Sequence, residues 1–178
     1  MYVTNTKIKG LKIVHQKKFG DTRGSLRETF RKKIIKWDNL IFDYATISKK
    51  NVLRGFHFNS KYPQAKYVTV LKGKILDCVV DLRKNSKTFG KSFSIILSED
   101  NCKSLYIPEG FAHAYYSFHK SNLIYYKLSN YYEPKYENGI AWNDKKLKFK
   151  WPANKPILAK RDKNWQSFEA FKKKFKGF

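Results

Sequence analysis

One stretch of the sequence decides the fold: Lys66-Tyr67-Val68-Thr69-Val70-Leu71, the turn residues Lys72-Gly73-Lys74, and Ile75-Leu76-Asp77-Cys78-Val79-Val80-Asp81-Leu82. In both runs β-branched and other apolar residues alternate with polar ones, which is the period of a half-buried strand. A glycine between two lysines is a turn signal. We therefore expect a β-hairpin over residues 66–82.

Similar runs recur along the chain, at residues 92–97, 105–107, 111–118 and 123–128. Turn residues such as Pro108-Glu109-Gly110 separate them. Short strands at these intervals are typical of β-sandwiches and barrels. No long repeat or linker interrupts the pattern. The sequence predicts one mainly β domain over residues 1–178.

Two segments carry helical patterns. Within the charged stretch from Leu26 to Trp37, residues 31–36 could form a short helix. Towards the C-terminus, lysines separate phenylalanines at three- and four-residue spacing: Phe168, Phe171, Phe175 and Phe178. This second pattern predicts an amphipathic helix. Docking on a membrane surface or a partner is one interpretation, but we favour packing of the Phe stripe onto the β-structure.

Composition limits the class of protein. The chain has 178 residues, of which 42% are hydrophobic and 17% aromatic, so it can bury a real core and does not resemble a disordered chain. It has no apolar run of membrane-spanning length and no signal-peptide pattern. Cys78 and Cys102 are not spaced as metal ligands, and nothing requires a disulfide. We expect a cytoplasmic protein with no membrane partner.

The net charge of +24 comes from 38 Lys and Arg against 14 Asp and Glu. Such a field attracts polyanions, of which nucleic acid is the first to consider. The lysines are spread along the chain, however, and no zinc-finger, RNA-binding or recognition-helix pattern accompanies them. We expect a compositional bias rather than nucleic-acid binding, with a positive cleft that steers a small phosphate-bearing substrate as a by-product.

His57, in Leu53-Arg54-Gly55-Phe56-His57-Phe58, is the first candidate for chemistry. Imidazole titrates near neutral pH and is a natural general base, although a lone histidine on a strand is usually structural. On a regular strand Arg54 and His57 would face opposite sides, but Gly55 could bulge the strand and bring them together. His113 is the rival candidate.

Histidines also raise the question of a metal. Many double-stranded β-helix proteins bind one through two His separated by one residue, with a nearby carboxylate. Here Phe58 and Asn59 follow His57, and His15 and His119 lie outside any ligand spacing. The sequence therefore predicts a site without a metal.

A series of short motifs runs in order from Phe19 to Asp162. The first is Phe19-Gly20-Asp21-Thr22-Arg23-Gly24, followed by Glu28 and Phe30, and the second is Val52-Leu53-Arg54-Gly55-Phe56-His57-Phe58. Then come Gln64-Ala65-Lys66, residues 79–90, residues 107–113, Tyr126-Lys127, residues 130–132, residues 139–144 and residues 156–162. Each motif alone is weak, but the ordered series closely resembles the dTDP-4-dehydrorhamnose 3,5-epimerase family.

The resemblance implies a double-stranded β-helix, the cupin-type jelly-roll barrel, used without a metal and generally as a homodimer. It also implies proton transfer beside a ketone in a nucleotide-linked 4-keto-6-deoxy sugar. A base removes a proton from C3 or C5 to give an enolate, and an acid returns a proton to the opposite face. No redox cofactor is needed, in agreement with the lack of a G-x-G-x-x-G fingerprint. We expect no cofactor.

The resemblance assigns roles to individual residues. His57 is the base, Asp162 orients and charges it, and Tyr126 is the acid. Lys66 stabilises charge on the C4 oxygen. The remaining residues that it implies contact the nucleotide sugar, its diphosphate or its base: Phe19, Arg23, Glu28, Arg54, His113 and Tyr132. In the family's dimers the N-terminal strands reach the neighbouring subunit's site, so Phe19 and Arg23 are expected to act in trans.

Recognition positions depart from the family pattern. Asn59 replaces a Gln, and Tyr44-Ala45-Thr46 replace a Gln-x-Asn before Ser48. We expect Tyr44, Thr46 and Asn59 to line the cavity and to change specificity rather than reaction class. The expected substrate is dTDP-4-dehydro-6-deoxyglucose. A GDP-linked 4-keto-heptose and epimerisation at a single carbon are the alternatives, and a sugar- or polyanion-binding β-barrel module is the non-enzyme alternative.

Overall fold

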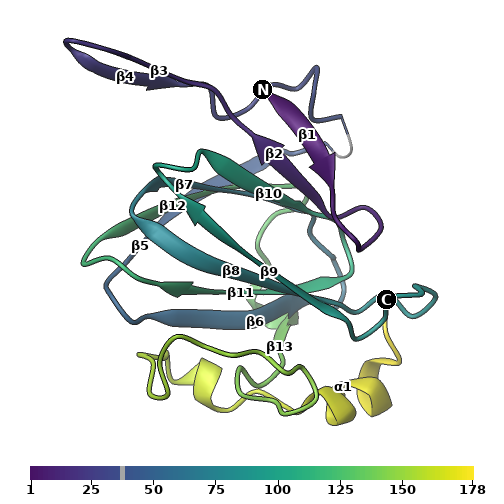
Figure 1. Cartoon of the computed structure of the whole chain (residues 1–178). Coiled ribbons are helices and arrows are strands. Elements are labelled where there is room, and N and C mark those ends of the chain that lie inside the picture. The colour runs from purple at the N-terminus through teal and green to yellow at the C-terminus, as the bar shows by residue number, and fades with distance from the viewer. Residues whose placement is uncertain (37–38) are drawn as a thin grey trace.

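The computed structural model describes residues 1–36 and 39–178. Two antiparallel sheets face each other (Figure 1). One has the order β1 (Tyr2–Asn5), β2 (Lys12–His15), β10 (Lys103–Ile107), β7 (Lys66–Lys72), β12 (Asn122–Leu128) and β5 (Phe42–Ser48). The other has the order β13 (Glu137–Gly139), β6 (Leu53–Asn59), β11 (Phe111–Ser117), β8 (Lys74–Asp81) and β9 (Ser92–Ser98). This arrangement confirms the predicted mainly β jelly-roll fold.

The main core lies between the two sheets. Alternate residues of each strand point inward, so Val68 and Val70 of β7 face Ile75 and Val79 of β8, and all four are fully buried. Every strand run predicted from the sequence is present within one or two residues of its expected ends. The cavity described below opens in this inter-sheet layer.

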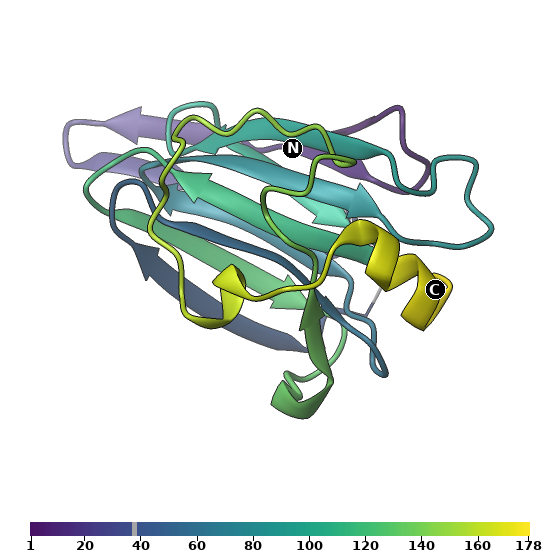
Figure 2. The ribbon, with the colours of Figure 1, turned by 90° about the horizontal axis from the view of Figure 1, so that it is seen from below.

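The outer face of the five-stranded sheet is covered by the C-terminal part of the chain. The short 3-10 helices η1 (Pro134–Tyr136) and η2 (Arg161–Lys163) and the helix α1 (Phe168–Phe175) belong to this part, and Figure 2 shows η2 and α1 lying across the sheet. Ser167 caps α1 by accepting a hydrogen bond from the Ala170 N–H. Phe171 is fully buried and meets Phe58 edge-on at 5.3 Å. The predicted C-terminal helix and its packing are confirmed.

The predicted hairpin over residues 66–82 is wrong. β7 pairs with β10 and β12, whereas β8 pairs with β11 and β9 in the other sheet. The turn at Gly73 is a corner between sheets: its N–H donates to Glu99 Oε1 at 2.7 Å, and the Lys74 N–H donates to Asn122 Oδ1 at 3.0 Å. Alternation shows which side of a strand is buried, but it does not identify the neighbouring strand.

The predicted helix at residues 31–36 is also wrong. The Ile34 and Ile35 N–H groups both donate to the Arg31 carbonyl, which makes a single turn rather than a helix. Six residues are too few to stabilise a helix without tertiary support. One turn is enough to bury Ile35 against Tyr67 on the outer face of the six-stranded sheet. Trp37, the end of the charged stretch considered in the sequence, lies outside the described residues.

The strands β3 (Lys18–Asp21) and β4 (Gly24–Arg27) form a separate hairpin that projects from the body of the molecule (Figure 1). Phe19 and Leu26 on this hairpin are 58% and 67% exposed. The hairpin therefore presents two large apolar side chains to solvent. In the part of the chain that the structure covers, no helix has the length and apolar character needed to span a membrane.

Candidate active site

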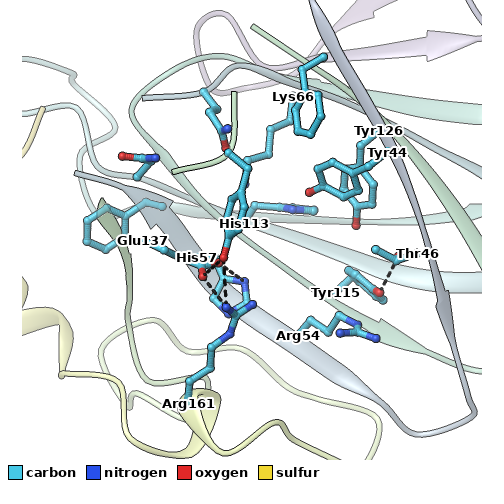
Figure 3. Close-up of a pocket in the computed structure, with 15 residues that line it drawn as sticks. Tyr44, Thr46, Arg54, His57, Lys66, His113, Tyr115, Tyr126, Glu137 and Arg161 are labelled. Carbon is cyan, nitrogen blue, oxygen red and sulfur yellow. Dashed lines mark hydrogen bonds and ion pairs between the residues drawn. The ribbon is translucent and has the colours of Figure 1, made fainter. Parts of the chain in front are cut away.

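A cavity of about 440 Å³ opens between the two sheets (Figure 3). Side chains from both sheets and from the C-terminal segment form its wall: Phe42, Tyr44, Thr46, Arg54, His57, Phe58, Asn59, Gln64, Lys66, His113, Tyr115, Tyr126, Tyr132, Glu137 and Arg161. Aromatic rings and cationic groups dominate this list. A concave site of this size with a few converging polar groups is typical of a small-molecule site.

A bulge in β6 brings Arg54 and His57 to the same side. On β11, His113 lies opposite His57 and Tyr115 lies opposite Arg54, so three steps on β6 match two on β11. Gly55, between the two, has φ +121°, and a Cβ there would lie 2.4 Å from the Ala114 Cβ. The bulge therefore requires glycine, and it places both side chains in the cavity as the sequence suggested.

His57 is held by a buried carboxylate. Its Nε2 lies 2.6 Å from Oδ1 of Asp162, whose side chain is 1% exposed. Asp162 belongs to η2, and the Trp165 Nε1–H donates to the same Oδ1 at 3.0 Å. Burial disfavours the charged carboxylate, but the hydrogen bond and charge of His57 and the bond from Trp165 outweigh it and lower the pKa of Asp162. An ionised Asp162 fixes the proton on Nε2 and leaves the lone pair on Nδ1.

The other nitrogen of His57 faces a second carboxylate. Nδ1 lies 3.8 Å from Oε1 of Glu137, at the start of β13. The other oxygen of Glu137 accepts hydrogen bonds from the Tyr132 hydroxyl at 2.7 Å and from the Arg161 guanidinium. This network, visible at the lower centre of Figure 3, closes one end of the cavity. Arg161 balances the charge of Glu137, so the carboxylate can remain next to the imidazole.

Lys66 brings an unpaired cation to the cavity from the six-stranded sheet. No described residue gives its ammonium group a hydrogen bond or ion pair. Burial lowers the pKa of Lys66 to about 8, against the smaller opposing effects of the Glu137 and Asp77 carboxylates. Near neutral pH this side chain is a positive charge without a fixed anion. It can therefore stabilise negative charge that develops on a bound molecule.

His113 has a buried carboxylate of its own. Its Nε2 lies 2.9 Å from Oδ2 of Asp77, which is fully buried on β8. The other oxygen, Oδ1, is buried with no hydrogen-bond partner in the described chain. Asp77 thus orients His113 at the cavity wall, in the same way that Asp162 orients His57.

Tyr126 lies on the opposite sheet from His57. It is 3% exposed, and its ring stacks on Tyr44 and meets His113 edge-on. Burial, with smaller effects from Tyr115, Tyr44 and Asp77, raises the pKa of Tyr126 well above its ordinary value of 10. A phenol in this environment keeps its proton at neutral pH and can donate it to a stronger base such as a carbanion.

Arg54 occupies the other end of the cavity. Its Nε donates to the Ser48 hydroxyl at 3.2 Å, and the Tyr115 hydroxyl lies 2.8 Å from Ser48 and 3.1 Å from Thr46. The described members of this network are hydroxyl groups, so no carboxylate among them neutralises the guanidinium. A planar cation in this position suits a phosphate.

The comparisons with known proteins point to one family. The family model described as dTDP-4-dehydrorhamnose 3,5-epimerase matches residues 5–170. The chain belongs to this family. A Shigella flexneri protein named dTDP-4-dehydrorhamnose 3,5-epimerase is 38% identical over 174 residues, which cover 94% of this chain and 96% of that protein.

Two solved structures extend the likeness. The dTDP-6-deoxy-D-glucose-3,5-epimerase from Legionella pneumophila, in complex with dTDP-4-keto-L-rhamnose, has a TM-score of 0.89 and 35% identity over 94% of this chain and 92% of its own. A 3'-monoepimerase from Streptomyces bikiniensis, in complex with dTDP-quinovose, has a TM-score of 0.89 and 26% identity over 97% of this chain and 90% of its own. The family resemblance found in the motifs is therefore confirmed over nearly the whole chain.

In the structure, most of the site residues predicted from the sequence lie around one cavity. The cavity wall includes Tyr44, Thr46, Arg54, His57, Asn59, Lys66, His113, Tyr126 and Tyr132, and Asp162 lies directly behind His57. Asn59 also has a local task, because its Oδ1 accepts the N–H groups of Lys61 and Tyr62. The Oδ1 atom of Asn59 is thus occupied by these two N–H groups, and the side chain contributes mainly to the shape of the wall.

Three residues predicted from the epimerase motifs do not join the cavity of their own chain. Phe19 and Arg23 lie on the projecting β3–β4 hairpin, where Arg23 pairs with Asp21 at 2.7 Å. Glu28 follows the hairpin and pairs with Arg31. None of the three side chains lines the cavity beside His57.

Six wall residues were missed from the sequence: Phe42, Phe58, Gln64, Tyr115, Glu137 and Arg161. Two of them could have been found from the strand period, since Phe42 is two residues from Tyr44 and Tyr115 is two from His113. Arg161 precedes Asp162 directly. Glu137 gave no periodic signal, because it directly follows the 3-10 helix η1 and belongs to a strand of three residues.

Proposed function

We propose that this protein is a nucleotide-sugar 3,5-epimerase that acts on dTDP-4-dehydro-6-deoxyglucose without a cofactor. One observation carries the proposal: His57 on one sheet, paired with Asp162 of η2, and Tyr126 on the facing sheet border the same cavity. A sugar ring between the sheets would meet a base on one face and an acid on the other. Inversion at a carbon requires that arrangement.

The chemistry begins with removal of a proton. The C3 and C5 protons of the sugar are acidic because the C4 carbonyl lies between these carbons. His57 Nδ1 takes the proton, and the charge of Asp162 stabilises the imidazolium that forms. The electrons of the broken C–H bond move to the C4 oxygen as an enolate, and the ammonium group of Lys66 stabilises that oxygen.

Tyr126 completes the reaction. Its O–H bond breaks as a new C–H bond forms on the face opposite His57, and the phenolate then regains a proton from water. Arg54 would bind the diphosphate. Because Tyr126 is kept protonated by its surroundings, it acts after the enolate has formed. The same two groups can serve C3 and C5 in turn if the sugar moves between them.

We also propose that the active protein is a homodimer. The β3–β4 hairpin would place Phe19 and Arg23 against the cavity of the second subunit, where the ring and the guanidinium would contact the nucleotide. The exposure of Phe19 and Leu26 supports this arrangement. A net charge of +24 would oppose association at low ionic strength.

The test is isotope exchange in deuterium oxide, followed by NMR at C3 and C5 separately. With dTDP-4-keto-6-deoxyglucose, the wild type should incorporate deuterium at both carbons and invert them. His57→Ala should abolish exchange, and His119→Ala, an exposed histidine outside the cavity, should leave it intact. Tyr126→Phe should impair net inversion more than proton abstraction. Tyr125→Phe is its matched control, because that hydroxyl bonds to Asp43 at the surface.

A panel of sugars separates the alternatives. Exchange at one carbon alone would make the protein a single-carbon epimerase, a possibility that the structural likeness to a 3'-monoepimerase favours. Turnover of GDP-linked 4-keto sugars alone would reassign the nucleotide. Absence of exchange with every dTDP- and GDP-linked 4-keto sugar would refute the proposed function.

A further inference from the structure

Tyr44 and Tyr126 form a stacked pair at the cavity wall. The two residues are direct cross-strand partners in the β5–β12 ladder. Their ring centroids lie 4.8 Å apart with 25° between the planes, and Figure 3 shows both rings at the same end of the cavity. An offset stack of this kind fixes the position of each ring relative to the other.

Among the described residues, the other ring in contact with Tyr126 is that of His113. His113 meets the ring edge-on at 6.1 Å, and the facing residue on β7 is Val68, a smaller apolar side chain. Neither the Tyr44 hydroxyl nor the Tyr126 hydroxyl makes a hydrogen bond to a described residue. With no hydrogen bond to orient the phenol of Tyr126, ring packing has to do so.

The direction of this phenol matters for the reaction. Once His57 has removed a proton, the enolate has two fates. His57 can return a proton to the same face, which regenerates the substrate, or Tyr126 can protonate the opposite face, which gives the inverted product. The second fate needs the Tyr126 O–H directed at the enolate carbon. A phenol that samples other directions loses this competition.

We propose that Tyr44 is a positioning residue for the acid Tyr126, and that its ring determines how often the enolate is inverted rather than returned. This inference rests on the proposed function. It assigns to Tyr44 a task different from contact with the nucleotide, because the ring acts through Tyr126. The aromatic ring is the part that matters, and the hydroxyl of Tyr44 is dispensable.

The test compares Tyr44→Leu with Tyr44→Phe. Each variant is incubated with dTDP-4-keto-6-deoxyglucose in deuterium oxide, and NMR measures deuterium in the recovered substrate against inverted product. This ratio comes from active molecules alone, so partial unfolding of a variant does not change it. Phe93→Leu, which removes a ring packed on the same core outside the cavity wall, is the control for loss of an aromatic side chain.

Tyr44→Leu should raise the ratio of exchange to inversion by roughly 2- to 12-fold, the range that corresponds to one aromatic pair. Tyr44→Phe and Phe93→Leu should keep the wild-type ratio. The inference is overturned if Tyr44→Leu keeps the ratio, if it raises KM alone, or if Tyr44→Phe is as impaired as Tyr44→Leu. Absence of exchange in the wild type would instead refute the proposed function.

Discussion

Replacing Lys66 with methionine should stabilise the fold while it impairs the reaction. The side chain brings a positive charge into a half-buried position, where no described residue pairs with it as an anion. Burial lowers its pKa from 10.5 to about 8, and at about 1.4 kcal/mol per pKa unit this difference corresponds to about 3 kcal/mol. Water in the cavity screens part of it, so this figure is an upper value. Methionine has a similar length and carries no charge.

The sign of the effect follows from proton binding. A lysine whose pKa is lowered by folding destabilises the folded state below pH 8, where it is protonated in both states. As the pH rises from about 8 to 10.5, the folded chain releases this proton before the unfolded chain does, and the wild type gains stability. Lys66→Met lacks this gain. Its advantage is therefore largest near pH 7 and shrinks towards pH 10.

Urea unfolding at pH 7 and at pH 9.5 measures the difference in unfolding free energy between Lys66→Met and the wild type, and the change of this difference with pH. At pH 7, Lys66→Met should unfold with a free energy up to about 3 kcal/mol higher, or a Tm roughly 6–12 °C higher for a chain of this length. Lys72→Met, an exposed position on the same strand, is the matched control and should show no pH-dependent difference. Equal or lower stability of Lys66→Met at pH 7, or a difference that does not vary with pH, would refute the reasoning.

The same variant should lower kcat/KM by about 100-fold or more, because the enolate oxygen loses its cation. In the wild type, kcat/KM should fall as the pH rises through about 8, where Lys66 loses its charge. Lys66→Met should lack this basic limb. A wild-type profile that stays flat between pH 7 and 9.5 would show that the ammonium group does not assist the reaction.

Three further predictions concern other parts of the molecule. Asp162→Asn keeps the shape of the buried side chain but removes its charge, and deuterium exchange should fall by at least about 100-fold; exchange at the wild-type rate would exclude Asp162 as the partner of the base. Gly55→Ala should lower the unfolding free energy in urea by about 3 kcal/mol. Gly24→Ala, at φ +132° with no atom within 4 Å of the new Cβ, should lower the unfolding free energy by less. Equal losses for the two variants would show that overlap of the new Cβ with Ala114 is not the cause. Phe19→Ser should weaken the dimer in sedimentation equilibrium, whereas a fully active wild-type monomer would refute sites shared between subunits.

The sequence was sufficient to predict the fold class and the contact between His57 and Asp162, which lie far apart along the chain. Alternation located the strands, and the ordered motifs linked His57 to Asp162, which the structure places 2.6 Å apart. Strand partners were not accessible in this way. The run through Gly73 was expected to fold back on itself, because a short turn between two strands gives the same pattern in a hairpin and in a corner between sheets.

Two of the missed wall residues, Glu137 and Arg161, were missed for the same physical reason. On a strand, the residues two positions away indicate which side of the sheet a side chain faces. A residue in a very short element has no such neighbours. Glu137 and Arg161 come from short elements of the C-terminal segment and meet each other and Tyr132 through tertiary contacts alone. The projecting hairpin is the converse case: the motif there is easily recognised, but its residues have no site within their own chain.

The groups around His57 come from two parts of the chain: the two sheets, and the C-terminal segment that covers one of them. Arg54, His57, Lys66 and Tyr126 all lie on strands of the two sheets. The carboxylate that holds the imidazole of His57 comes instead from the C-terminal segment that covers the five-stranded sheet. The pair of His57 and Asp162 is therefore complete only when this segment is docked on the sheet.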